Sequence, residues 1–321
     1  VAVRILAERE KEIEAFKSEP YWSLEPRFQK TGTPPPFSAR LVVWKGEKVE
    51  STEPYQLFAE EYRVKKTIFR SLDSAEIAAG KIKPGPFKVV SVEKKEVSRR
   101  PLAPHTTSTL QQEGSRKLGF AADRTMRTAQ TLYEGVALGG EDTVGLITYM
   151  RTDSVNVAKV AQQEAAEFIR ERFGKDFVPA EPPLYQTKSK SAQEAHEAIR
   201  PTSAARTPED MKPFLSPEQQ KVYDLVWKRF MASQMAPARF DAVSIEISAG
   251  SPPEDGLFRA AGRTLLFEGY LKVYRTRDTD EEELEEKDED ESRLPLVKEG
   301  DILECLDLAP AEHSTTPPPA Y

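Results

Sequence analysis

The feature that most constrains the fold is a change in the spacing of apolar residues, which occurs twice along the chain. In residues 37–105 and 236–321 apolar and polar residues alternate in several stretches, as they do in half-buried β-strands. In residues 106–235 apolar residues recur instead every three or four positions, the spacing of amphipathic helices. We therefore predict a mostly helical domain inserted into a split β-rich domain, preceded by a partial helical domain over residues 1–36.

Capping residues, glycine and proline set the expected ends of the elements. The helices predicted in this way cover 1–17, 108–118, 123–134, 155–173 and a segment starting at Ser216. The predicted strands lie at 37–44, 87–97, 243–247 and 265–273. Ser108 and Gln111 are the expected capping box of the second helix. An insertion of this kind leaves two chain connections at one junction, on which a hinged gate can be built.

Composition excludes several classes of protein. No apolar run approaches the roughly 20 residues that cross a bilayer, and no basic and then apolar leader is present, so a cytoplasmic protein is expected. Cys305 is the only cysteine, which excludes an intramolecular disulfide and a zinc site built on paired cysteines. The absence of a G-x-x-x-x-G-K-[ST] loop argues against a nucleotide-driven reaction.

The net charge of −7 disfavours a nucleic-acid partner only until its distribution is considered. Residues 278–291 contain eleven carboxylates and one lysine, so the rest of the chain is mildly basic. We expect this acidic run to be a flexible solvated loop. Because the chain starts within a helical pattern and ends in the proline-rich sequence TTPPPAY, we also expect it to be part of a longer protein.

The sequence GLITYMRTDS at residues 145–154 carries the first candidate site. As a strand it would place Tyr149 and Arg151 on one side, and Asp153 and Ser154 would cap the helix that follows. A helix N-terminus and an arginine can hold a phosphate within reach of the tyrosine. A tyrosine hydroxyl, with an ordinary pKa near 10, needs such positive charge to become a nucleophile. On spacing alone, a packed ring beside a solvated arginine remains the favoured alternative.

The second candidate site is SAQEAHEAIRP at residues 191–201. Ser191 and Glu194 form a capping box, and Pro201 limits the predicted helix to about residue 199. One face of this helix suits a phosphate backbone and carries Gln193, His196, Glu197 and Arg200. From the pattern alone, a solvated helix with a surface histidine is the favoured alternative.

These two motifs, with STLQQEGSRKLGF and RTMRTAQTLYEG before them, closely resemble the catalytic gate of bacterial DNA topoisomerase I, a member of the type IA topoisomerase family. The resemblance extends over essentially the whole chain. It implies an ATP-independent enzyme that relaxes negatively supercoiled DNA by cutting one strand, passing another strand and rejoining the first. It also implies a catalytic-gate domain at 106–235, a β-rich arch or hinge domain at 37–105 and 236–321, and part of a helical base domain at 1–36.

The resemblance further implies roles for single residues. Tyr149 would attack the scissile phosphate and remain attached to the 5′ phosphate, leaving a free 3′ hydroxyl. Arg151 would position that phosphate, and His196 would contribute to DNA binding and rejoining. The other residues expected to contact DNA or to support the nucleophile are Arg4, Arg9, Thr148, Asp153, Ser154, Gln193, Glu197 and Arg200.

One part of the family's active site has no match in this sequence. In the family, cleavage and rejoining depend on Mg²⁺ and on an N-terminal Toprim domain with an acidic metal motif. Asp278, Asp280 and Glu282 fit the bare motif but lie in the acidic run without an apolar strand to hold them, so solvated charge is the better interpretation. We expect this chain to bind no catalytic magnesium and to be inactive alone. Its expected partners are single-stranded or negatively supercoiled DNA, the missing Toprim domain and the later DNA-groove segments, with no membrane and no second copy.

Two alternatives remain at this stage. The helices predicted at 108–118 and 123–134, with Gly119 between them, have the size of a helix-turn-helix DNA reader. The second of these helices offers Arg124 and Arg127 but few amides to contact bases, and the hypothesis leaves most of the chain unexplained. A purely structural scaffold is the other alternative. Covalent trapping on single strands would support the topoisomerase, and tight duplex-specific binding would support the helix-turn-helix.

Overall fold

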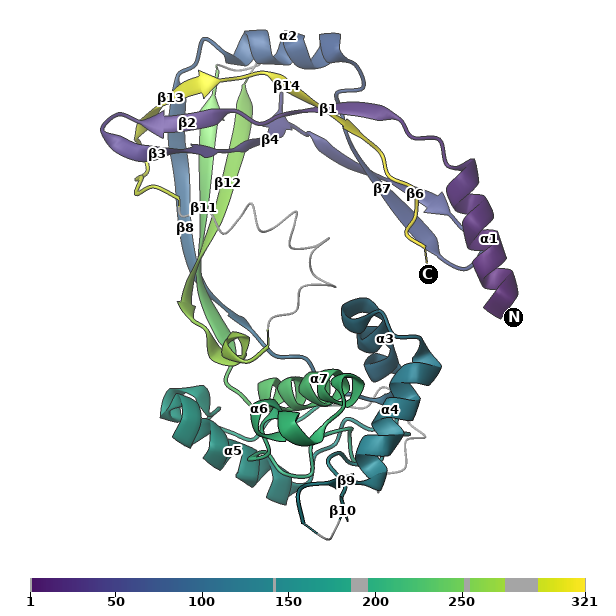
Figure 1. Ribbon diagram of the computed structural model, residues 1–321. Helices are drawn as coiled ribbons and strands as arrows, with labels where there is room; N and C mark the ends of the chain where they lie inside the picture. The colour runs from purple at the N-terminus through teal and green to yellow at the C-terminus, as the bar shows by residue number, and fades with distance from the viewer. Residues whose placement is uncertain (1, 141–142, 186–195, 251–254, 275–293, 321) are drawn as a thin grey trace. The chain divides into compact units, whose positions relative to one another are not determined.

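The computed structural model describes residues 2–140, 143–185, 196–250, 255–274 and 294–320 (Figure 1). They form two compact units. The β unit comprises Val1–Lys95, Ala242–Thr264 and Asp288–Tyr321, and the helical unit comprises Glu96–Asp241 and Leu265–Lys287. Within the described residues, the chain passes from one unit to the other after residues 95, 241 and 264.

An eight-stranded sheet with the order β3-β2-β13-β8-β11-β12-β4-β5 organises the β unit. Its strands are β2 (Arg27–Lys30), β3 (Thr33–Ser38), β4 (Arg40–Trp44), β5 (Glu47–Lys48), β8 (Phe87–Arg99), β11 (Ala238–Ala249), β12 (Gly256–Phe267) and β13 (Ile302–Asp307). Helix α2 (Leu72–Ile82) packs on this sheet through alanines and Ile82. Gly256 permits the close approach, since a Cβ there would lie 2.9 Å from Leu41 and 3.2 Å from Ile82.

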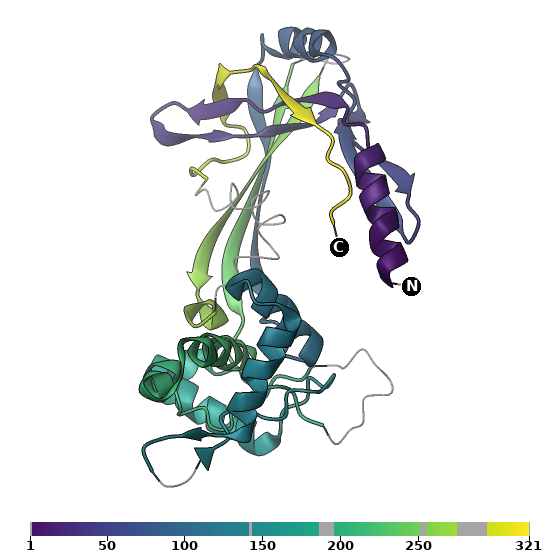
Figure 2. The same ribbon diagram turned by 45° about the vertical axis from the view of Figure 1, so that its right-hand side comes forward.

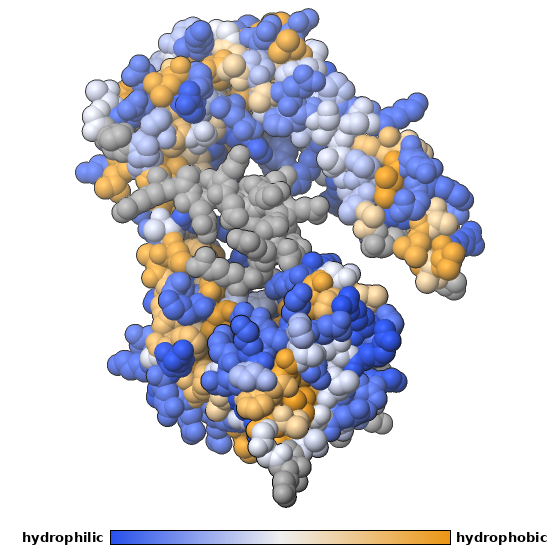
Figure 3. Space-filling view, in the orientation of Figure 1, coloured by the Kyte–Doolittle hydropathy of each residue, from blue (hydrophilic) through white to orange (hydrophobic). Residues whose placement is uncertain are grey.

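Two smaller strand pairs complete the β unit. They are β1 (Pro20–Leu24) with β14 (Pro310–Ser314), and β6 (Glu50–Gln56) with β7 (Glu61–Thr67). Helix α1 (Ala2–Ala15) lies beside the β6–β7 hairpin in both views (Figures 1 and 2). The contact includes a hydrogen bond of 2.5 Å from the Phe58 N–H to the Glu12 carboxylate. Apolar residues are exposed on α1 (Figure 3), where Val3 is 79% exposed.

The helical unit has its core around one central helix. Its helices are α3 (Thr107–Leu118), α4 (Ala122–Glu134), α5 (Lys159–Phe173), α6 (Pro208–Met211) and α7 (Pro217–Ser233), with a short pair of strands, β9 (Val136–Ala137) and β10 (Thr143–Val144). Helix α7 buries residues on most of its surface. Its two buried polar aromatics are satisfied, because Tyr223 and Trp227 donate hydrogen bonds to the carbonyls of Arg206 and Ala204.

Several predicted element ends agree with the structure, and two predictions do not. The strand end at Trp44, the helix end before Gly119 and the helix start at Ser216 are confirmed. The predicted capping box is wrong, because Thr106 and Thr109 form it. The strand predicted at 265–273 is also wrong, since β12 ends at Phe267 and Gly269–Lys272 form a 3₁₀ turn. Gly269 has φ of +49°, and a Cβ there would lie 2.4 Å from the Pro237 carbonyl oxygen.

Among the described residues, no helix combines the length and the apolar character needed to span a lipid bilayer. The acidic run at 278–291 lies outside the described residues.

Candidate functional site

The strand predicted over 145–154 is not formed, because the segment has only an isolated bridge at Ile147 and a bend at Met150, yet its side chains alternate between exposed and buried from Tyr149 onward. Tyr149 is 46% exposed and Arg151 is exposed, whereas Met150 and Thr152 are 3% and 7% exposed. Alternation is the geometry of an extended chain. Tyr149 and Arg151 therefore share the exposed side, as the sequence indicated, while Met150 packs into the core of the helical unit.

One edge of this segment is bonded to residues 198–202. Ile147 and Pro201 form an isolated antiparallel bridge. The Thr148 N–H donates to the Arg200 carbonyl at 2.9 Å, and the Thr148 hydroxyl donates to the Ala198 carbonyl at 2.7 Å. Both the backbone and the side chain of Thr148, the residue before Tyr149, are thus hydrogen-bonded, and a role for Thr148 in supporting the nucleophile stays a prediction.

The helix predicted over 191–199 is wrong in its described part. Residues 196–198 have no helical structure, and Ile199 forms a bridge with His105. Long-range partners take the backbone groups that a helix would have used, because the Ala198 N–H donates to the Asn156 carbonyl and the Ile199 N–H to the His105 carbonyl, each at 2.8 Å. Residues 191–195, and with them Gln193, lie outside the described residues.

The other edge of the Tyr149 segment is bonded to Thr107, at the start of α3. The Thr107 hydroxyl donates to the Met150 carbonyl and accepts from the Thr152 N–H, both at 2.8 Å. The Thr107 N–H also donates to the Thr152 carbonyl at 2.9 Å. One side chain therefore fixes the backbone on both sides of Arg151. Thr107 was not among the predicted site residues, and its position in the capping sequence HTTST was the available signal.

The end of α4 contacts the same segment from a third direction. The Leu146 N–H donates to the Leu132 carbonyl at 2.8 Å. Gly145 approaches so closely that a Cβ there would lie 2.7 Å from the Tyr133 carbonyl oxygen. The rings of Tyr133 and Tyr149 meet edge to face, with centroids 5.4 Å apart and an interplanar angle of 64°. Tyr133 is a second residue that the sequence analysis missed.

The helix after the segment begins later than predicted, at Lys159 rather than near Val155. Side-chain oxygens bond to the intervening backbone, since Thr152 accepts from the Ser154 N–H at 3.0 Å and Ser154 accepts from the Asn156 N–H at 3.1 Å. Such local bonds compete with a helix. Asp153 and Ser154 are therefore not helix caps, and the prediction that a phosphate rests on a helix N-terminus at these residues is wrong.

The remaining residues of the second motif lie next to this arrangement along the chain. His196 is exposed and lies two positions before Ala198, whose carbonyl Thr148 contacts. The Glu197 carboxylate accepts from the Ala158 N–H, the N-cap of α5, at 2.6 Å and pairs with Arg200 at 2.7 Å. Arg200 also donates to the Pro201 carbonyl. The bonds of Glu197 and Arg200 are structural ones, and a role in DNA binding for either stays a prediction.

The two arginines predicted from the N-terminal helix belong to the β unit and differ in exposure. Arg4 is exposed and lies 5.0 Å above the Phe58 ring, a cation–π contact. Arg9 is only 2% exposed, and its guanidinium contacts Glu12, Glu60 and the Pro319 carbonyl. Arg4 thus offers an accessible charge for a phosphate, whereas Arg9 holds α1 to its neighbours.

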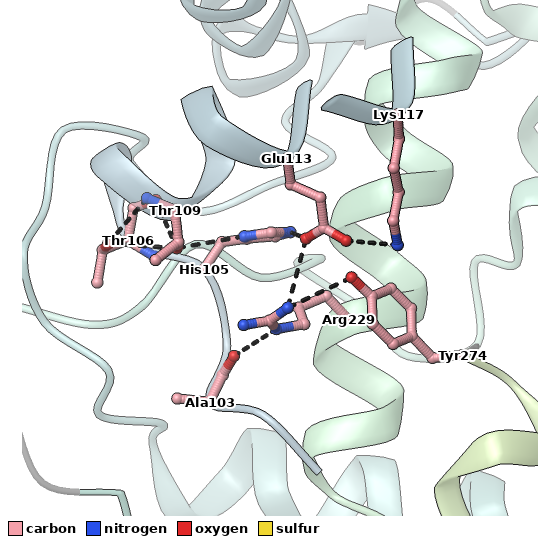
Figure 4. A network of polar contacts seen from close by, with 8 residues as sticks. All are labelled: Ala103, His105, Thr106, Thr109, Glu113, Lys117, Arg229 and Tyr274. Atoms are coloured by element: carbon pink, nitrogen blue, oxygen red, sulfur yellow. Dashed lines mark hydrogen bonds and ion pairs between the residues drawn. The ribbon is translucent and has the colours of Figure 1, made fainter. Parts of the chain in front are cut away.

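A largely buried set of charged and polar residues lies along α3 (Figure 4). Glu113 contacts His105 at 3.1 Å, Lys117 at 2.6 Å and Arg229 at 3.4 Å, and Arg229 also donates to the Tyr274 hydroxyl at 3.3 Å. We call these five residues the Glu113 network. It supports the site because the backbone of His105 accepts from Ile199, and because Thr107 follows His105 by two residues.

Charge within the Glu113 network is set by burial and by its cations. Burial alone would raise the pKa of Glu113, but the contacts with His105 and Lys117 and the charge of Arg229 lower it to about 2. Burial lowers the pKa of the fully buried His105. We therefore expect an ionised carboxylate held by Lys117 and Arg229 at neutral pH. This network was not predicted, because its members are far apart in the chain.

Chemically, the arrangement presents a phenol and a guanidinium on one exposed, well-supported stretch of backbone. A guanidinium can bind a phosphate through two hydrogen bonds, and the phenol can attack phosphorus. Within the described residues, no three His, Cys, Asp or Glu side chains come together as a possible metal site.

Comparison with known proteins identifies relatives over the whole chain. The family model described as DNA topoisomerase matches residues 1–321. DNA topoisomerase 1 of Xylella fastidiosa is 44% identical in strain Temecula1 and 43% identical in strain 9a5c, over 324 residues in each case. Both alignments cover 100% of this chain and 37% of the relative's length. The structure of full-length topoisomerase I from Thermotoga maritima is similar with a TM-score of 0.72 and 29% identity, covering 99% of this chain and 45% of that one.

Proposed function

Because the chain belongs to the DNA topoisomerase family, we propose that it is the part of a type IA enzyme that supplies the nucleophile for cutting one DNA strand. The Tyr149 oxygen would form a bond to the scissile phosphorus as the bond from phosphorus to the 3′ oxygen breaks. The phenol proton would end on the 3′ oxygen, leaving a free hydroxyl and a 5′-phosphotyrosine. Rejoining is the reverse reaction, so the bond energy is kept and no ATP is needed.

The observation that carries this proposal is the exposure of Tyr149 and Arg151 on one segment whose alternate residues are buried. Hydrogen bonds from Thr148 and Thr107 hold the backbone on either side. A phosphate bound by Arg151 would be met by a nucleophile on a backbone with little freedom to move, and such positioning is itself a large part of catalysis. His196 would join the phosphate or the 3′ end from the neighbouring segment.

The substrate we propose is single-stranded or negatively supercoiled DNA, which places the protein at the nucleoid in the cytoplasm. The Mg²⁺ that the family resemblance implies would be bound by the N-terminal Toprim domain rather than by this chain. The helical unit would act as the catalytic gate and the β unit as the arch, with residues 1–36 contributing to the base. We propose that the protein acts as a monomer.

The helix-turn-helix alternative has less support. The two arginines of α4 that it would use are engaged on the surface, since Arg124 pairs with Glu218 and Arg127 pairs with Asp123. The exposed amide and hydroxyl of α4 are engaged as well, since Gln130 donates to Glu134 and Thr131 donates to the Thr128 carbonyl.

The test is covalent trapping in the longer protein that carries this chain and its Toprim domain. With Mg²⁺ and a 3′-end-labelled single-stranded oligonucleotide, denaturant should leave the label attached to the protein. Tyr149→Phe should abolish attachment, because it removes the attacking oxygen. Tyr133→Phe is the matched control, since it removes the neighbouring phenol and keeps the ring. Attachment that persists in Tyr149→Phe would overturn the proposal.

A second test concerns the chain by itself. We expect it not to relax negatively supercoiled plasmid, because the metal-binding domain that cleavage requires in the family would be missing. The measurement is agarose-gel relaxation with and without the separately produced Toprim domain, with Tyr149→Phe to exclude a contaminating enzyme. Relaxation by the wild-type chain alone would contradict the assignment of essential groups to the missing domain.

A further inference from the structure

The side chain next to the proposed nucleophile is Tyr133, on the last turn of α4. The two rings meet edge to face, an arrangement that aromatic pairs favour. Tyr133 is 43% exposed and Tyr149 is 46% exposed, so neither ring is a core residue. Exposed tyrosines gain little stability from burial, and the pair needs another explanation than packing of the core.

The backbone that carries Tyr133 is tied to the backbone that leads to Tyr149. Leu132 is fully buried, and its carbonyl accepts the Leu146 N–H. The Tyr133 carbonyl faces Gly145 at a distance that leaves no room for a Cβ. These contacts fix the backbone of Tyr133 relative to the backbone that leads to Tyr149. The ring contact therefore does not depend on a mobile element.

The Tyr149 side chain has few other restraints. Over the part of the chain that the structure describes, none of the hydrogen bonds involves the Tyr149 hydroxyl, and its ring contact is with Tyr133. A half-exposed tyrosine can otherwise occupy several staggered χ1 positions. The edge contact selects among them and leaves the hydroxyl open to solvent and substrate.

We propose that Tyr133 is a positioning residue for the nucleophile: its ring restricts Tyr149 to the orientation from which the phenol oxygen attacks phosphorus. This inference rests on the proposed function. The aromatic ring of Tyr133 supplies this restriction and its hydroxyl does not, because the contact is made by ring edges and faces. Removing it should lower the rate of covalent attachment at saturating DNA by about two- to tenfold, the range expected from the strength of such ring pairs. DNA affinity should stay unchanged.

The experiment has one arm that does not depend on cleavage. In the full-length protein with ring-labelled tyrosine, the Tyr149 signals are assigned by their loss in Tyr149→Phe and are measured without DNA. Tyr133→Ala should shift these signals, because the ring current of its neighbour is lost, and Tyr133→Phe should leave them nearly in place. Unchanged signals in Tyr133→Ala would overturn the contact itself.

The second arm measures attachment rate and DNA affinity separately. Tyr133→Ala should attach more slowly at saturating oligonucleotide with wild-type affinity, Tyr133→Phe should restore the rate, and Gln130→Ala, one turn earlier on the exposed side of α4, should behave as wild type. An unchanged rate in Tyr133→Ala would overturn the proposal. A weaker affinity with an unchanged saturated rate would overturn it in favour of a ring that stacks on a DNA base. Failure of the wild type to attach would instead refute the proposed function.

Discussion

Replacing Glu113 by glutamine should destabilise the helical unit by about 3 kcal/mol at neutral pH. Glutamine keeps the shape of the side chain but removes the negative charge that faces Lys117 and Arg229. Removing one partner of a buried ion pair costs about 3–5 kcal/mol. We expect the lower end of this range for Glu113→Gln, because Arg229 keeps its hydrogen bonds to the Ala103 carbonyl and the Tyr274 hydroxyl.

The pKa of Glu113 leads to the same size of effect and adds a pH dependence. The folded-state pKa is about 2 against an ordinary value of 4.5, and a difference of this size corresponds to about 3 kcal/mol. Because the pKa is lowered in the folded state, this stabilisation is complete above the unfolded pKa of 4.5 and is lost as the pH falls toward 2. Glutamine does not titrate, so the difference between wild type and Glu113→Gln should shrink over this range.

Urea unfolding at pH 7 and at pH 3 measures this difference. Trp227 is the tryptophan of the helical unit, and replacing Trp22 and Trp44 by phenylalanine leaves it as the only fluorescent reporter. His105 also favours unfolding on acidification, since burial lowers its pKa, so the comparison uses the difference between the two proteins. Glu134→Gln, an exposed carboxylate on α4, should change stability by less than about 0.5 kcal/mol.

Suppose that Glu113→Gln lowers the free energy of unfolding by less than about 1 kcal/mol at pH 7. That result would refute the importance of the Glu113 charge, because a buried carboxylate facing two cations should cost more than that to neutralise. If Glu113→Gln lowers the free energy of unfolding equally at pH 7 and pH 3, the pKa of Glu113 is not lowered in the folded protein. Either result would mean that the charge of Glu113 is better solvated than its burial indicates.

Two further substitutions test the support of the Tyr149 segment. Gly145→Ala should destabilise the helical unit by about 1–3 kcal/mol and slow covalent attachment, because its Cβ would lie 2.7 Å from the Tyr133 carbonyl oxygen. Gly140→Ala, where a Cβ meets nothing within 4 Å, is the control, and equal thermal unfolding of the two variants would contradict the close contact. Thr107→Val should cost about 1–3 kcal/mol, because it removes the hydroxyl that bonds the backbone on both sides of residue 151. Thr107→Ser should retain stability and attachment, and a valine variant as stable as the serine variant would show that this hydroxyl is dispensable.

Local chemistry predicted much of the fold. The helix start at Ser216-Pro217 combines a side-chain cap with a proline that needs no hydrogen-bond partner, and both signals are local. Gly119 ends α3 with a positive φ of 65°, which glycine adopts without strain. The common exposure of Tyr149 and Arg151 followed from the period of an extended chain, since the pattern requires no knowledge of its partners.

The predictions that failed depended on partners distant in the sequence. Residues 196–199 have a helical pattern, yet Asn156 and His105 take their backbone N–H groups. The hydroxyls of Thr152 and Ser154 accept backbone hydrogen bonds that delay the start of α5. The N–H of the N-cap residue donates to Glu197, a carboxylate from another segment. Composition likewise gave no sign of these pairings. Tertiary hydrogen bonds thus overrode local propensity at the candidate site.

The most direct test of the central claim is to locate the attached nucleotide. The covalent adduct formed by the longer protein on single-stranded DNA is digested with nuclease and protease, and the modified peptide is sequenced by mass spectrometry. The account predicts a nucleotide joined through its 5′ phosphate to Tyr149, in the peptide that contains Arg151. A nucleotide on Tyr133, or on any residue outside the segment 145–154, would contradict it.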